Sequence, residues 1–175
     1  MLNPTNHRNL AVMNEDEPEK NGEAEKVREK SAGIEERLFK ARTILIYGGI
    51  DQKVAKDVSA RLLALQAEGD DPITIFINSQ GGHVESGDTI YDMIKFVKPE
   101  VRVVGTGWVA SAGALIYVAA KKENRFALPN TRFLLHQPAG GAMGPASDVA
   151  IQAKEIIRMR RRLNEIFARE TGQPT

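Results

Sequence analysis

The chain has 175 residues, a formal net charge of +1 and no cysteine. This length suits one domain with a full core, and the neutral balance gives no indication of a nucleic-acid or membrane partner. The missing cysteine excludes disulfides and thiol catalysis. The N-terminus lacks a signal-peptide core, and the longest weakly polar run, residues 108–120, is too short to span a bilayer. We therefore expect a cytoplasmic protein.

Composition changes near Ile34. Residues 1–33 contain five Lys/Arg and seven Asp/Glu, with almost no β-branched or aromatic residues. Such a segment buries too little apolar area to offset its chain entropy. We predict a disordered charged arm over 1–33 and a single globular domain over 34–175.

Strands and helices alternate in the globular part. A short apolar run over 43–47 predicts a strand, and a helix follows that Asp51 caps and residues 69–72 end. A second strand is predicted over 73–78. The helix after it ends before Pro99.

The second half continues this order. We predict a strand over 101–106, a helix that starts near Ser111, a strand over 131–136 and a long helix over 147–171 that closes at Gly172. Apolar strands joined by helical crossovers indicate an α/β fold with a parallel sheet covered on both faces.

Ser111 is the candidate nucleophile. It follows a strand and starts a helix, at the sheet edge where parallel α/β folds bind ligands, and its neighbours are small. The segment is not a Gly-x-Ser-x-Gly elbow, because Val109 occupies the first glycine position. The alternative is an ordinary helix cap.

His136 is the candidate base. It ends an apolar strand and should emerge at the same sheet edge as Ser111. The alternative is a structural donor to backbone. Since no aspartate lies between the two residues, their order argues against an α/β-hydrolase.

The pair Gly81-Gly82 ends the second strand, where its backbone could direct N–H groups at an oxyanion. The alternative is a turn that requires positive φ. His83 reads as a solvated loop histidine, and His7 has no assigned role.

Four segments resemble signatures of the Clp protease proteolytic subunit: Asn78-Ser-Gln-Gly-Gly82, Ala110-Ser-Ala-Gly113, Leu128-Pro-Asn130 and His136-Gln-Pro-Ala-Gly-Gly141. The resemblance runs from about Ile34 to Thr175. It implies that Ser111 is the nucleophile, that His136 is the general base, and that the backbone N–H groups of Gly82 and Ala112 form the oxyanion hole.

The same resemblance implies a fold, an assembly and partners. The fold would be a crotonase-like ββα spiral with a long interface helix, and the subunits would form a homo-oligomer of two stacked heptameric rings. Unfolded proteins would be delivered by an AAA+ unfoldase that uses ATP, so this subunit needs no cofactor and no metal. We expect no nucleic-acid or membrane partner.

The chain departs from the family pattern in four places. Gln80 and Ala112 replace the usual proline and methionine, and the arm lacks the apolar residues of the family's axial gate. The position of the triad aspartate falls past Thr175, and Asp88, Asp92 and Asp148 occupy other motif positions. We therefore expect a chain truncated before the triad aspartate, with no third triad acid and turnover lowered by roughly 10⁴.

Two alternatives stay open. One is a catalytically inactive or impaired ring subunit that lacks the triad aspartate. The other is a crotonase-type acyl-CoA enzyme, which would share the backbone oxyanion hole but need no serine–histidine pair. The arginines at 158 and 160–162 are interpreted as a solvated or ion-paired helix face.

Overall fold

The computed structural model describes residues 30–141 and 143–175. Residues 30–40 are helical, and residues up to Arg37 belong to a different compact unit from Leu38–Thr175. Most of the predicted arm lies outside the described residues, although its last four residues, 30–33, are helical. The division at Ile34 stays a prediction.

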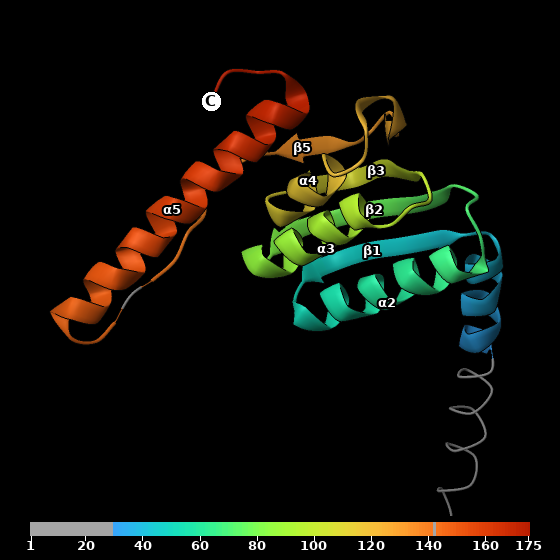
Figure 1. Ribbon diagram of the computed structural model, residues 1–175, viewed down its shortest axis with the longest axis horizontal. Coiled ribbons are helices and arrows are strands. Elements are labelled where there is room, and N and C mark those ends of the chain that lie inside the picture. The colour runs from blue at the N-terminus through green and yellow to red at the C-terminus, as the bar shows by residue number, and fades with distance from the viewer. Residues whose placement is uncertain (1–29, 142) are drawn as a thin grey trace, which may run out of the picture. The chain divides into compact units, whose positions relative to one another are not determined.

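Five parallel strands form one sheet in the unit Leu38–Thr175 (Figure 1). They are β1 (Thr43–Ile50), β2 (Ile73–Gly82), β3 (Val101–Ala110), β4 (Arg125–Ala127) and β5 (Arg132–Leu134). The order is β1-β2-β3-β4, and β5 pairs with the far end of β3. The predicted parallel sheet is confirmed. The strand β4 was not predicted; it is only three residues long and follows a polar 3₁₀ turn, Lys122–Asn124.

Four helices accompany the sheet: α2 (Gln52–Glu68), α3 (Val84–Phe96), α4 (Ala112–Tyr117) and α5 (Ala146–Thr171). The predicted cap of α2 is confirmed, since the carboxylate of Asp51 accepts a 2.8 Å hydrogen bond from the Val54 N–H. The predicted end of α5 is also confirmed: Gly172 is left-handed, with φ of 76°. No helix in the described ranges is both long and apolar enough to cross a bilayer.

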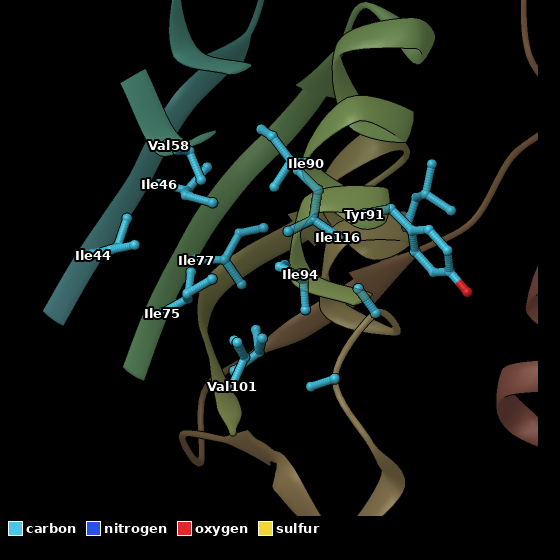
Figure 2. Close-up of a cluster of buried hydrophobic side chains, with 14 of the residues drawn as sticks. Ile44, Ile46, Val58, Ile75, Ile77, Ile90, Tyr91, Ile94, Val101 and Ile116 are labelled. Carbon is cyan, nitrogen blue, oxygen red and sulfur yellow. The ribbon is translucent and has the colours of Figure 1, made fainter. Parts of the chain in front are cut away.

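The core lies on one face of the sheet. Side chains from β1 and β2, including Ile46 and Ile77, meet Ile90 and Ile94 of α3 and Ile116 of α4 (Figure 2). Each is at most 5% exposed. Burial of this apolar area is what holds the crossover helices on the strands.

The opposite face of the sheet is open at its edges. Leu45 and Tyr47 of β1 are 46% and 54% exposed, and Phe126 of β4 is 48% exposed. The prediction of a sheet covered on both faces is therefore wrong for this chain alone. Apolar runs of this kind are typical of strands buried on both faces, so the open face suits a partner chain.

The long helix α5 is anchored through its C-terminal half. Ile166 is buried, and Leu163 and Phe167 pack against the core. Toward the N-terminal end, Ile151 and Ile157 are 61% and 68% exposed, and this end projects away from the sheet (Figure 1). Only the C-terminal part of α5 therefore serves the core of this chain.

A buried ion pair fixes the end of α5. The Arg125 guanidinium, whose side chain is 9% exposed, donates to the carbonyls of Val118, Ala120 and Glu170 at 2.8, 2.8 and 2.6 Å. It also donates to the Glu170 carboxylate at 3.0 Å. The Tyr91 hydroxyl donates to the same carboxylate at 2.5 Å. These contacts join α5 to α3 and to the β4 segment.

The protonation of Glu170 should control this anchor. Burial opposes ionisation, but the hydrogen bonds from Tyr91 and Lys95, with the charges of Lys95 and Arg125, lower the pKa of Glu170 below its ordinary 4.5. A lowered folded-state pKa contributes stability that is present above the unfolded pKa and lost as pH falls through the folded value.

We therefore expect wild-type stability to fall more steeply than that of Glu170→Gln as the pH is lowered through and below about 4.3. Urea midpoints of both proteins, measured at a series of acidic pH values, check this. If the urea midpoints of the two proteins fell in parallel as the pH was lowered, protonation of Glu170 would not account for the loss of stability.

Candidate active site

Ser111 lies at the turn between β3 and α4 in a strained backbone conformation. Its φ is 53° and its ψ is −120°. Non-glycine residues rarely adopt such angles, which cost about 1–3 kcal/mol and cluster at functional sites. A serine at a sharp strand-to-helix turn is the geometry of a nucleophile elbow, even though the sequence lacks the first elbow glycine. The helix-cap alternative is not supported, because the Ser111 side chain makes no cap hydrogen bond.

Because β5 pairs with the end of β3, His136 follows a strand that lies next to the start of the Ser111 turn. The Ser111 N–H donates to the Leu134 carbonyl at 3.0 Å, and His136 follows two residues later. Ser111 and His136 line one cavity of about 500 Å³. The expectation that both side chains emerge at the same sheet edge is confirmed.

The imidazole of His136 is held by backbone. Its Nδ1 lies 2.8 Å from the Gln137 carbonyl oxygen. A carbonyl can only accept, so Nδ1 carries a proton, and in the neutral ring the lone pair is then on Nε2. This contact favours the neutral tautomer that a general base requires.

No carboxylate lies within 4 Å of the His136 ring among residues 30–141 and 143–175. Asp88 pairs instead with Arg162 on α5, where burial raises its pKa and the guanidinium opposes that rise. Asp148 accepts a hydrogen bond from Ser147. Within these ranges, the orienting contact of the imidazole is a carbonyl.

The glycine turn at the end of β2 packs directly on the candidate nucleophile. Gly81 has φ of 94°, and a Cβ at this position would lie 2.6 Å from the Ser111 Cβ and 2.9 Å from the Ala110 carbonyl oxygen. The predicted close approach is thus present. The alternative interpretation, a turn that requires positive φ, is also correct for Gly81, because the residue has both a positive φ and a close contact with Ser111.

The two predicted oxyanion donors are the N–H groups of Ala112 and Gly82. Ala112 is the first residue of α4, so the helix itself leaves its N–H unused. At the turn, the Gly81 N–H is already bonded to the buried Ser79 Oγ at 3.0 Å. Gly82, which packs against Ile50 of β1, remains the candidate there.

Ser79 is a positioning residue that sequence reasoning did not single out. Its side chain is 1% exposed and donates to the Gly48 carbonyl at 2.6 Å while accepting from Gly81. It thereby ties the glycine turn to β1. The sequence feature that could have indicated this role is the position of Ser79 within the segment Asn78-Ser-Gln-Gly-Gly82.

The far wall of the cavity comes from α5, which sequence reasoning assigned only to an interface. Arg160, Leu163, Asn164, Phe167 and Thr171 line it opposite Ser111 and His136. These positions recur at helical spacing on one face. The helix α5 therefore provides both apolar and polar side chains to the cavity that Ser111 lines.

His83 does not line this cavity. His83 lies 3.3 Å from the Ser86 Oγ and 3.4 Å from the Glu85 carboxylate, at the start of α3. His7 lies outside the described residues. The described part of the chain holds no cluster of histidine and acidic side chains that could bind a metal.

The fold corresponds to that of solved ClpP1 structures. The structure of ClpP1 from Listeria monocytogenes superposes with a TM-score of 0.72 and 62% sequence identity, covering 81% of this chain and 78% of that one. This places the chain in the ClpP/crotonase fold class, as expected from its sequence.

Sequence comparison defines the family. The Clp protease family model matches residues 26–175. The ATP-dependent Clp protease proteolytic subunit 3 of Rhizobium meliloti (strain 1021) is 66% identical over 140 residues, which is 80% of this chain and 72% of that protein. The proteolytic subunit 2 of Pseudomonas aeruginosa is 58% identical over 142 residues, or 81% and 71% of the two chains. The chain belongs to the Clp protease family.

Proposed function

We propose that this chain is a serine endopeptidase subunit of an ATP-dependent Clp protease. Ser111 would attack the peptide carbonyl, and His136 would take its proton through Nε2. The backbone N–H groups of Gly82 and Ala112 would stabilise the resulting oxyanion.

One observation carries the proposal: Ser111 adopts an elbow conformation on a cavity that His136 also lines. The free Nε2 lone pair and the adjacent glycine turn supply the other parts of the site. No metal or cofactor is needed for this chemistry, since a histidine and backbone dipoles perform the proton transfer and charge stabilisation.

The proposal includes an assembly. The open sheet face at Leu45 and Tyr47 and the projecting end of α5 expose apolar surface that suits subunit contacts. We propose stacked heptameric rings of this chain in the cytoplasm. A separate AAA+ unfoldase would use ATP to deliver unfolded proteins.

Two other functions are distinguishable. An inactive ring subunit is favoured by the lack of a carboxylate at His136 within the described residues. It would assemble into rings and react with no serine-directed probe. An acyl-CoA enzyme would be protected by acyl-CoA and would keep its activity without Ser111.

Labelling with a fluorophosphonate tests the nucleophile. We expect the wild type to be labelled and Ser111→Ala to show no labelling and no peptide hydrolysis, because the reacting oxygen is gone. Gel fluorescence and mass mapping of the labelled peptide measure this.

Ser147→Ala is the matched control, since Ser147 is exposed at the start of α5 and should leave labelling unchanged. Equal labelling of the wild type and Ser111→Ala would end the nucleophile assignment.

A further inference from the structure

We propose that Arg160 makes the cavity select peptides that carry an acidic side chain, which rests on the peptidase function proposed above. Among the described residues that line this cavity, only His136 and Arg160 have an ionisable side chain. The other walls are apolar or uncharged, including Leu135, Leu163 and Phe167. Arg160 is exposed, so solvent and salt screen part of its charge, and an ion pair with a substrate carboxylate would discriminate modestly between substrate charges.

The charge of Arg160 is not used inside the described part of the chain. Its three arginine neighbours each meet a carboxylate: Arg158 meets Glu155 at 3.8 Å, Arg161 meets Glu165 at 4.0 Å, and Arg162 meets Asp88. Arg160 has no carboxylate within 4 Å in residues 30–141 and 143–175. A substrate carboxylate would be its first partner, and the guanidinium can bind it with two parallel hydrogen bonds.

The geometry of α5 fits an extended peptide. The cavity face runs from Arg160 to Thr171, which at about 1.5 Å per residue is roughly 16 Å. An extended chain advances about 3.3 Å per residue, so roughly five substrate residues span this face. A peptide held at Ser111 can therefore place another of its side chains beside Arg160.

A positional scan tests the proposal on the full chain. One quenched fluorescent peptide is made with glutamate, glutamine or lysine at each position in turn, and kcat/KM is measured. We expect glutamate to exceed glutamine by about fivefold at one position, in line with a partly exposed ion pair, and to lose this advantage at high salt. Arg160→Glu should reverse the preference toward lysine.

Arg158→Glu is the matched control, because Arg158 carries the same charge on the same helix but does not line the cavity. It should keep the glutamate preference. If Arg158→Glu reversed the preference as strongly as Arg160→Glu does, Arg160 would have no specific role in selecting the substrate.

Binding to the Ser111→Ala variant separates this proposal from the proposed activity. Fluorescence anisotropy with the same labelled peptides needs no hydrolysis. If no peptide is cleaved by the wild type while Ser111→Ala still binds the glutamate peptide more tightly, the peptidase assignment fails and the subsite stands. Equal affinities for the glutamate, glutamine and lysine peptides would overturn the subsite.

Discussion

Replacing Gly81 by alanine is expected to lower both fluorophosphonate labelling and peptide turnover by about 100-fold or more. The new methyl group would lie 2.6 Å from the Ser111 Cβ and 2.9 Å from the Ala110 carbonyl oxygen, both on the elbow itself. Gly81 also needs φ of 94°, which alanine rarely adopts. Misplacement of a reacting group by about 1 Å is sufficient for a loss of this size.

Gly141→Ala is the matched control, since a Cβ at Gly141 would meet nothing within 4 Å. It should retain labelling within about twofold of wild type, because an unstrained surface substitution has a small effect. Circular dichroism and size-exclusion profiles should show that Gly81→Ala remains folded. Full labelling of a folded Gly81→Ala protein would contradict the packing of the glycine turn on Ser111.

Removing the Arg125 side chain is expected to destabilise the protein by about 3–5 kcal/mol. Arg125→Ala deletes bonds to three backbone carbonyls and removes one partner of the Glu170 carboxylate, which is only 12% exposed and keeps its contacts with Lys95 and Arg169. The costly part of this change is the loss of the donor to three carbonyls, since those of the buried residues Val118 and Ala120 would be left unsatisfied. Equilibrium urea unfolding at a fixed protein concentration measures the loss.

The exposed pair of Arg161 and Glu165 provides the comparison. The Arg161 side chain is 83% exposed and 4.0 Å from its partner, so Arg161→Ala should cost less than about 1 kcal/mol. Because the end of α5 forms one wall of the cavity, Arg125→Ala should also raise KM. Similar unfolding midpoints for Arg125→Ala and Arg161→Ala would show that the Arg125 contacts do not anchor the helix.

Much of the secondary structure could be predicted because its causes are local. The cap at Asp51, the stop before Pro99 and the left-handed Gly172 each depend on the chemistry of a few adjacent residues. The strand β4 was missed because its cause is not local. Its three residues are defined by pairing with Val103–Gly105 of β3, not by any pattern of their own.

The sequence by itself determined an alternating α/β chain and the sheet edge at which Ser111 and His136 emerge, because strand direction follows from periodicity and crossovers. Only the tertiary structure decided that Gly81 touches Ser111, that the Gln137 carbonyl sets the His136 tautomer, and that α5 closes the cavity with Arg160. The α5 wall and the Gly81 contact join segments distant in sequence, and the tautomer depends on ring orientation. No local pattern encodes which side chains meet or how they turn.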